Sequence, residues 1–277
     1  SLPVPFELVN GDILPAYVNE NTLVMLSSYS GSTEETLSCG QQALVSKAKI
    51  TAVASGSKLA EFVKTNNLPA YIFNPLYNPA GQPRLGQGYM IAGHIGILAK
   101  IGLITLSDDE VNNAIDFLEK NNESIESLAK NTVEKFVEKI PIIVASSHLA
   151  GNAHTLRNQF NETAKNFSAY SLIPELNHHL MEGLLHPKER ILKFLFLRSS
   201  LYSPMIKKRF ALTKEVVEKN NLETIDIEIL GETLFAQTLY ALSFGGYLTF
   251  YLAIIYNQDP SVIPWVDYFK EKLSKTS

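Results

Sequence analysis

The chain has 277 residues, of which 45% are hydrophobic and 19% charged, so it can form one large or two modest folded domains and is not globally disordered. Lys and Arg total 24 and Asp and Glu total 28, a formal net charge of −4 without the basic excess typical of nucleic-acid binders. The single cysteine, Cys39, excludes a disulfide framework and any site that needs several cysteine ligands. Without paired cysteines the chain needs no oxidising compartment, and we expect a cytoplasmic protein.

No segment indicates a membrane span or an export signal. The longest apolar stretch, 235–256, is interrupted by Gln, Thr, Ser and Gly residues and is typical of a buried core helix. The first residues lack a charged segment followed by a continuous apolar run. The chain starts without Met and close to strand-like sequence, so we expect an N-terminal piece to be absent from it.

Strand-like and helical segments alternate along the first part of the chain. Short apolar runs that end in polar or turn residues predict buried parallel strands at 22–28, 50–54 and 70–73. Helices are expected between and after them, at 33–48, 58–66 and 90–101. A long polar helix is expected over 108–139, with Ser107 as its N-cap and Glu110 completing a capping box.

The same alternation restarts after the long polar helix. Strands are predicted at 141–145, 169–173, 191–197 and 224–230, and helices at 149–165, 176–185, 204–219, 232–256 and about 262–273. This pattern is typical of parallel sheets with helices on both faces. With the long helix as a linker, we expect two similar α/β domains, 1–120 and 121–277. Ligands of such sheets bind at the carboxyl ends of the strands, so we expect the loops after the strands to carry the site.

The most specific segment is 27–36, Ser-Ser-Tyr-Ser-Gly-Ser-Thr-Glu-Glu-Thr, between a predicted strand and a predicted helix. Its hydroxyls and the unpaired amides of a first helical turn suit a phosphate group, and Gly31 lets the backbone approach it. The segment is neither a Walker loop nor a dinucleotide-binding GxGxxG motif. By pattern alone, a Ser/Thr-rich helix cap with Glu35 or Thr36 as partner explains it equally well.

This segment resembles the phosphosugar loop of sugar isomerase (SIS) domains. Later segments resemble one subfamily, the bifunctional phosphoglucose/phosphomannose isomerases, in the same order from residue 28 to the C-terminus: QPRLG at 82–86, NETAK at 161–165, PELNH at 174–178, YLA at 251–253, DP at 259–260 and FK at 269–270. The resemblance implies two three-layer SIS domains and a metal-independent, cofactor-free enzyme of carbohydrate metabolism, including glycolysis and gluconeogenesis. Such an enzyme interconverts glucose 6-phosphate, and mannose 6-phosphate, with fructose 6-phosphate.

The resemblance also implies roles for residues in the first part of the chain. Ser28, Ser30 and Thr33 match the hydroxyls that hold the sugar phosphate. Arg84 matches the arginine near the reacting carbons. By its pattern alone, an arginine that follows a proline is more often a residue that caps or pairs within a loop.

Three residues in the second part match the remaining catalytic groups. Glu162 matches the carboxylate that moves the proton, and His178 and Lys270 match the groups assigned to sugar-ring opening. In the family the histidine reaches the site from the other subunit of a homodimer. The non-catalytic alternatives are a solvated helix residue for Glu162 and an exposed lysine for Lys270. A metal site at His178 and His179 is not expected, because adjacent helical side chains diverge.

The chemistry agrees with these residue types. Aldose–ketose isomerisation moves a proton between neighbouring carbons through an enediol, so one carboxylate that removes and returns the proton suffices. A guanidinium stabilises the developing oxyanion without titrating, and a histidine is suited to ring opening near neutral pH. No step requires a metal ion.

Two departures from the family pattern leave other hypotheses open. The family begins with a strand and a Gly-Gly-Ser-type loop that contacts the phosphate, and the first domain lacks both here. His179-Leu180 and Gly245-Gly246 also depart from the family's usual residues. The alternatives are a non-catalytic sugar-phosphate-binding module and a different SIS enzyme, such as an amino-sugar isomerase. We expect neither a nucleic acid nor a membrane as partner.

Overall fold

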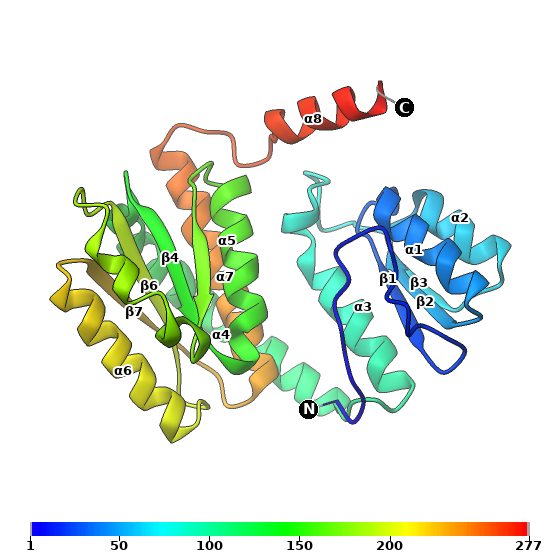
Figure 1. The fold of residues 1–277 in the computed structure, drawn as a ribbon, viewed down its shortest axis with the longest axis horizontal. Helices are drawn as coiled ribbons and strands as arrows, with labels where there is room; N and C mark the ends of the chain where they lie inside the picture. The colour runs from blue at the N-terminus through cyan, green and yellow to red at the C-terminus, as the bar shows by residue number, and fades with distance from the viewer. Residues whose placement is uncertain (1, 276–277) are drawn as a thin grey trace. The chain divides into compact units, whose positions relative to one another are not determined.

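The computed structural model describes residues 2–275, and the chain divides into two compact units, Ser1–Leu106 and Ser107–Ser277 (Figure 1). Each unit is built on one parallel sheet with helices against both faces, so the predicted α/β class is confirmed. All seven predicted strands form, each within two residues of its expected bounds.

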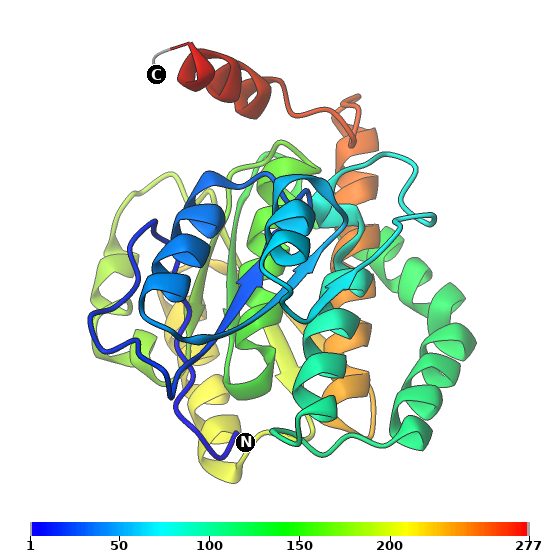
Figure 2. The same ribbon diagram turned by 90° about the vertical axis from the view of Figure 1, so that its right-hand side faces the viewer.

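The first unit contains a three-stranded sheet in the order β1-β2-β3. Its strands are β1 (Leu23–Ser27), β2 (Lys49–Ala54) and β3 (Ala70–Ile72), and the register pairs Leu23 with Lys49 and Ala52 with Ala70. Figure 2 looks at this unit from the side of α1 (Glu34–Val45) and α2 (Ser57–Thr65), while α3 (Gln87–Lys100) covers the other face. The core under α1 and α2 consists of small and branched apolar side chains, among them Leu26, Ala43, Ile50, Leu59 and Val63.

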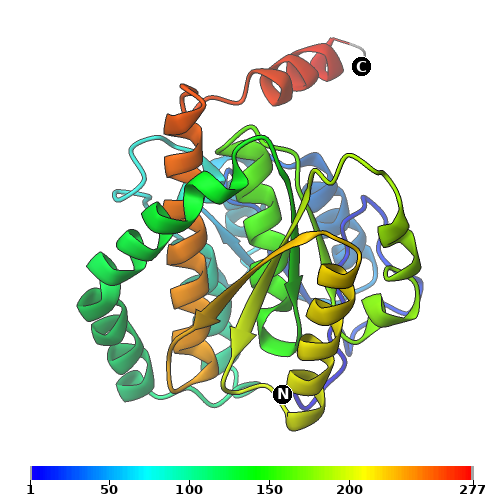
Figure 3. The ribbon, with the colours of Figure 1, turned by 90° about the vertical axis from the view of Figure 1, so that its left-hand side faces the viewer.

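The second unit contains a four-stranded sheet in the order β5-β4-β6-β7. The strands are β4 (Ile140–Ala145), β5 (Ala169–Leu172), β6 (Leu192–Ser199) and β7 (Glu223–Ile229). Figure 3 shows α6 (Pro204–Lys219) in front of this sheet, with α5 (Ala150–Glu162) and α7 (Leu234–Ile255) on the opposite face. Because β4 and β6 are central and covered on both faces, they carry near-continuous apolar sequence.

The long polar helix is part of the second unit and not a linker. It is α4 (Asp108–Val133), and it packs along α7 through a buried stripe that includes Ala114, Ile125 and Ala129. The compact units divide at 106/107, whereas the sequence pattern predicts a domain boundary at 120/121; Ile125 and Ala129 of this stripe belong to the core of the second unit. The Oγ of Ser107 accepts a hydrogen bond from the Glu110 amide at 3.1 Å, which confirms the predicted N-cap.

Helix α7 is long and apolar enough to cross a membrane by length and composition alone. In this structure it packs against α4 and α5, and its Tyr240, Phe244 and Leu248 are part of the core of the second unit. This packing explains its apolar sequence, as expected for a core helix.

The segment 176–185 does not form the predicted short helix. It forms two 3₁₀ turns, η4 (Glu175–His178) and η5 (Glu182–Leu185). Only Leu176 and Leu184 are buried in these two turns, and two anchors are too few to stabilise a continuous helix on an exposed surface.

Candidate functional site

The candidate phosphate-binding hydroxyls lie on one turn between β1 and α1. The hydroxyls of Ser28 and Thr33 are 2.7 Å apart, and the Gly31 amide donates to Ser28 Oγ at 3.0 Å. The hydroxyls of Ser30 and Ser32 are 3.0 Å apart on the exposed side of the same turn. The turn therefore gathers Ser28, Ser30 and Thr33 at the carboxyl end of β1, where ligands of parallel sheets bind.

The start of α1 favours anion binding over the helix-cap alternative. Thr33 occupies the N-cap position, but its side chain makes no capping hydrogen bond and instead contacts Ser28. The first-turn amides of α1 are therefore not satisfied by the residue that the cap interpretation requires. Unpaired amides at the positive end of a helix dipole attract an anion, although Glu34 and Glu35 already place two carboxylates in this turn.

Gly31 joins this turn to the loop after β2. Its φ is +73°, and a Cβ on it would lie 1.9 Å from the carbonyl oxygen of Gly56, so no side chain fits there. The Leu59 amide donates to the Gly31 carbonyl at 2.8 Å, and the Ser55 amide donates to the Tyr29 carbonyl at 2.8 Å. The hydroxyl-bearing turn is thereby held by backbone contacts on a second strand end.

Arg84 lies after the carboxyl end of β3, in the 3₁₀ turn η1 (Pro83–Leu85). Its side chain is buried, and its guanidinium Nη1 donates to Gln82 Oε1 at 3.0 Å. A buried guanidinium held by a neighbouring side chain is a pre-oriented positive charge, which suits a developing oxyanion.

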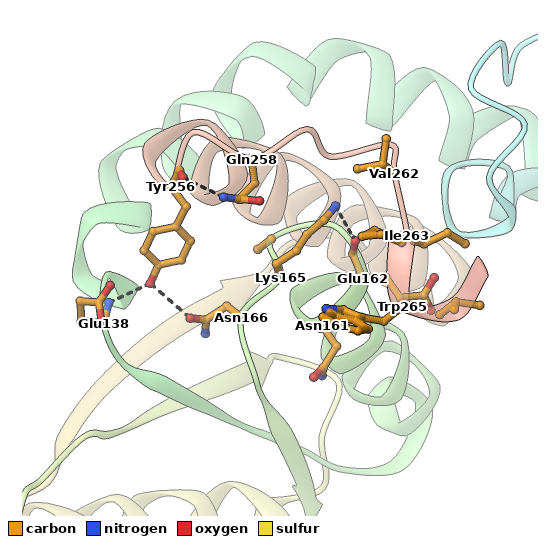
Figure 4. A pocket seen from close by; sticks show the side chains of 13 residues that line it. Glu138, Asn161, Glu162, Lys165, Asn166, Tyr256, Gln258, Val262, Ile263 and Trp265 are labelled. Atoms are coloured by element: carbon orange, nitrogen blue, oxygen red, sulfur yellow. Dashed lines mark hydrogen bonds between the residues drawn. The ribbon is translucent and has the colours of Figure 1, made fainter. Parts of the chain in front are cut away.

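Glu162 is the last residue of α5 and lines a cavity of about 690 Å³ in the second unit. Figure 4 shows the cavity between the end of α5 and the segment that leads into α8 (Pro264–Ser274). The glutamate is half-buried. The negative end of the helix dipole makes this an unfavourable place for a carboxylate. The remaining lining residues are Glu138, Asn161, Ala164, Lys165, Asn166, Tyr256, Gln258, Val262, Ile263, Pro264, Trp265 and Val266.

The ammonium of Lys165 organises the polar side of this cavity. Its Nζ donates to the carbonyl oxygens of Glu162 at 3.0 Å, Thr163 at 3.3 Å and Asp259 at 2.6 Å. The end of α5 and the segment before α8 are therefore held by one side chain, and Figure 4 shows Lys165 beside Glu162. A positive charge at the carbonyl end of a helix is also favourable to the helix itself.

The apolar side of the cavity comes from the start of α8. Trp265 lines the cavity and remains 81% exposed. Lys270 is exposed and lies four residues after Val266, so it is on the same face of α8 but one turn beyond the cavity wall. The structure thus brings Glu162 and the start of α8 together, and does not place Lys270 in the cavity.

Glu162 lies at the amino ends of the strands of the second sheet, and His178 lies at their carboxyl ends. Glu162 ends the helix before β5, and the Asn166 side chain in the connecting loop donates to the carbonyl of Lys139, just before β4. His178 is exposed and follows the carboxyl end of β5, where Ile173 accepts a hydrogen bond from Ser146 Oγ. The four residues of β5 alone span about 13 Å.

One expectation about position changes accordingly. The turn 28–33, which we call the phosphate turn after its predicted ligand, and Arg84 both follow strands, but the Glu162 cavity lies at the amino ends of the strands of the second sheet. Glu138, which precedes β4, is part of its lining. The sequence does not predict the position of this cavity, because no local pattern at the end of a helix indicates at which end of the strands it lies.

The histidine pair does not act as a unit. His179 Nε2 bonds to the Glu175 carboxylate at 2.9 Å, while the neighbouring His178 is exposed. Within residues 2–275, no three His, Cys, Asp or Glu side chains gather in a way that could hold a metal ion. Cys39 is buried, and burial raises the pKa of its thiol, which makes it a packing residue and not a nucleophile.

Comparisons with known proteins identify the family. Residues 125–273 match the family described as the bacterial phospho-glucose isomerase C-terminal SIS domain. A bifunctional phosphoglucose/phosphomannose isomerase from Caldicellulosiruptor bescii is 32% identical over 280 residues, which cover 97% of this chain and 81% of the relative. The chain belongs to the bifunctional phosphoglucose/phosphomannose isomerase family.

Further similarities agree with this assignment. The enzyme of the same description from Aquifex aeolicus is 28% identical, over 98% of this chain and 82% of the relative. The crystal structure of a glucosamine-6-phosphate deaminase from Thermotoga maritima matches with a TM-score of 0.68 at 15% identity, over 90% of this chain and 74% of the other. At that identity the structural match supports the SIS fold and not a particular substrate.

Sequence reasoning missed two residues that the structure brings into the candidate sites. Trp265, the only tryptophan of the chain, is in the wall of the Glu162 cavity, and its rarity was the one signal that could have marked it. Asn78, in a proline-containing loop, is buried between the phosphate turn and the Arg84 turn. Nothing in the local sequence distinguishes this asparagine from an ordinary turn residue.

Proposed function

We propose that the chain is an aldose–ketose isomerase that interconverts fructose 6-phosphate with glucose 6-phosphate and with mannose 6-phosphate. Membership of the isomerase family supports this activity, and the placement of Glu162 carries it. The carboxylate that matches the family's proton-transferring group lies half-buried in the wall of a cavity of about 690 Å³. A glutamate that serves only as a solvated helix residue would not need to be half-buried in a cavity.

In the proposed reaction, Glu162 removes a proton from C1 of open-chain fructose 6-phosphate. The resulting enediolate carries negative charge on its oxygens, and the Arg84 guanidinium stabilises that charge. Glu162 then returns the proton to C2, and the hydroxyl proton moves from the oxygen of C1 to the oxygen of C2, so the base is regenerated and atoms balance. The face of C2 that receives the proton decides between the glucose and mannose configurations.

The phosphate turn holds the other end of the substrate. Ser28, Ser30 and Thr33, with the first amides of α1, bind the phosphate on C6. Binding at this non-reacting end orients the sugar and lowers the entropic cost of the proton transfer. Lys270 and His178 assist ring opening as an acid–base pair.

The proposed active form is a homodimer in which His178 acts in the site of the partner subunit. The support is topological: β5 separates Glu162 from His178 within one subunit, and His178 is exposed. A histidine at the carboxyl ends of the strands can reach the cavity that contains Glu162 only if that cavity belongs to the partner subunit. We further propose a cytoplasmic enzyme whose two SIS domains correspond to the units 1–106 and 107–277.

A coupled assay tests the activity directly. Fructose 6-phosphate is supplied, glucose 6-phosphate is detected through its dehydrogenase, and mannose 6-phosphate is then offered as substrate in the reverse direction. Turnover with both aldoses is expected without added metal. Binding of fructose 6-phosphate without turnover would identify a non-catalytic sugar-phosphate module instead, and turnover only of an amino-sugar phosphate would identify a different SIS enzyme.

A further inference from the structure

In the segment 74–82 before the Arg84 turn, Asn78 is the one buried side chain. Tyr77 is 89% exposed, whereas the adjacent Asn78 is only 5% exposed. A buried amide in an otherwise solvated loop requires hydrogen-bond partners, because burial without them is costly. The partners of Asn78 connect two parts of the proposed substrate site.

The Asn78 side chain donates two hydrogen bonds in different directions. Its Nδ2 lies 2.6 Å from the Tyr29 hydroxyl and 2.8 Å from the carbonyl oxygen of Gln82. Tyr29 is in the middle of the phosphate turn, and Gln82 is the residue before the Arg84 turn η1. Asn78 therefore joins the two by a single amide group.

Gln82 transmits this contact to Arg84. Its carbonyl oxygen accepts from Asn78 and also from the Leu85 amide at 3.0 Å, which closes the 3₁₀ turn that contains Arg84. Its side-chain oxygen accepts from the Arg84 guanidinium at 3.0 Å. Gln82 therefore contacts the guanidinium through its side chain and Asn78 through its carbonyl oxygen, which links Asn78 to the position of Arg84.

The other end of the connection, Tyr29, is rigid. Its ring packs edge-on against Phe73, with centroids 5.4 Å apart, and against the backbone of Gly86. A Cβ at Gly86 would lie 2.4 Å from the Tyr29 ring, so a glycine is required for this contact. The carbonyl oxygen of Tyr29 also accepts a hydrogen bond from the Ser55 amide. A rigid tyrosine is a fixed reference point for the Arg84 loop.

We propose that Asn78 is a positioning residue that sets the distance between the phosphate turn and the Arg84 guanidinium. The inference rests on the proposed function. In a hexose 6-phosphate the phosphate is on C6 and the reacting carbons are C1 and C2, so the two protein groups must match the length of the substrate. Misplacement by about 1 Å can cost on the order of 100-fold in rate.

A purely structural role explains the arrangement less well. The Oδ1 of Asn78 is buried without a hydrogen-bond partner among the described residues, which costs free energy. An apolar residue would avoid that cost but would provide no donors to Tyr29 and Gln82. The asparagine therefore trades stability for a defined geometry.

The kinetic test compares Asn78→Ala, Tyr29→Phe and the double variant with the wild type. The phosphate turn keeps its backbone bonds to the β2 loop, so inorganic phosphate should inhibit Asn78→Ala with a Ki within about threefold of wild type, while kcat falls about 10–100-fold. Tyr29→Phe keeps the ring but removes the hydroxyl, and its effect should disappear in the Asn78→Ala background.

Asn66→Ala is the matched control. Asn66 Nδ2 bonds to the Phe62 carbonyl at 2.9 Å in the same unit, but at the end of α2 and without contact to either loop. It should lower the melting temperature and leave kcat unchanged. If Asn78→Ala behaved in the same way, or lost phosphate binding in parallel with kcat, Asn78 would be an ordinary structural residue and the proposal would be overturned.

A second measurement does not depend on activity. Arg84 is the only tryptic site between Lys64 and Lys100, and it is buried. Under native conditions Asn78→Ala should be cleaved after Arg84 faster than the wild type or Asn66→Ala, as judged by fragment mass. Unchanged cleavage would refute the connection to Arg84 even if the wild type proved inactive, whereas absent wild-type turnover by itself refutes only the proposed function.

Discussion

The side-chain ammonium of Lys165 lies 2.6 Å from the backbone carbonyl oxygen of Asp259, 94 residues later in the chain. The same ammonium also bonds to the carbonyl of Glu162. One side chain therefore holds the end of the helix that carries the candidate base and the segment that leads to Trp265. Catalytic geometry depends on such supporting contacts as well as on the reacting groups.

Replacing this ammonium should loosen the start of α8. Lys165→Met keeps the aliphatic stem and removes the three hydrogen bonds, so the fluorescence anisotropy of Trp265, the sole tryptophan, should decrease. We expect kcat to fall by about tenfold, because the cavity wall loses its position relative to Glu162. Lys219→Met, which removes only an exposed pair with Glu215, is the control. Equal anisotropy and kcat in a folded Lys165→Met protein would contradict this role.

Glu162→Gln should abolish isomerisation without unfolding the protein. The amide keeps the shape of the side chain but cannot accept the proton, and the loss of a general base typically costs roughly 10²–10⁴-fold in rate. The measurement is the coupled fructose 6-phosphate assay beside a thermal melt. Near-normal turnover of this variant would eliminate Glu162 as the base.

Ser30→Ala and Thr33→Val should weaken sugar-phosphate binding more than they reduce stability. Each removes one hydroxyl from the phosphate turn, and a hydrogen bond to a charged group is worth about 1.5–3 kcal/mol. KM should rise, and inorganic phosphate should compete less well with substrate. A crystal soaked with fructose 6-phosphate provides the direct check: a phosphate bound elsewhere would return the turn to the helix-cap interpretation.

Mixed dimers test the assignment of His178 to the partner's site. Glu162→Gln and His178→Ala subunits are each expected to be inactive, and they are unfolded together and refolded. Each mixed dimer then regains one intact site, so activity should approach about a quarter of the wild-type value under random pairing. If verified heterodimers stayed inactive, each site would have to be built within one chain.

Glu223 is expected to stabilise the second unit by neutralising a buried cation. Lys193 is only 4% exposed, and its Nζ lies 2.5 Å from the Glu223 carboxylate, which Lys139 also contacts at 3.1 Å. Glu223→Gln leaves that ammonium without its carboxylate and should cost about 1–2 kcal/mol in urea unfolding, since Glu223 itself is largely exposed. Lys193→Met removes the buried charge and should cost less.

The pH dependence of this pair has a definite sign. Hydrogen bonds from Lys193 and then Lys139 hold the pKa of Glu223 below its usual value. A carboxylate with a lowered folded-state pKa contributes stability above its unfolded pKa, and that contribution is lost as the pH falls through the lowered value. The difference in unfolding free energy between wild type and Glu223→Gln should therefore shrink on acidification. A constant difference down to strongly acidic pH would contradict the pairing.

The local features of this protein could be predicted from its sequence. Short runs of branched apolar residues are typical of buried strands, so every strand from β1 to β7 could be predicted. The Ser107 cap and the hydroxyl-rich turn before α1 could also be predicted, because the hydrogen bonds of caps and turns join residues only a few positions apart. The order of the family's motifs along the chain also indicates the isomerase family from the sequence alone.

Contacts between distant residues were decided only by the tertiary structure. The polar sequence of α4 suggested a linker, yet its narrow apolar stripe packs on α7, more than 100 residues later. The joining of Tyr29 to Gln82 by Asn78, and the separation of Glu162 and His178 at opposite ends of the strands of one sheet, likewise have no local pattern. Hydrogen bonding within a segment is set by nearby residues, whereas burial and the position of a side chain depend on which remote surfaces meet when the sheet and helices pack together.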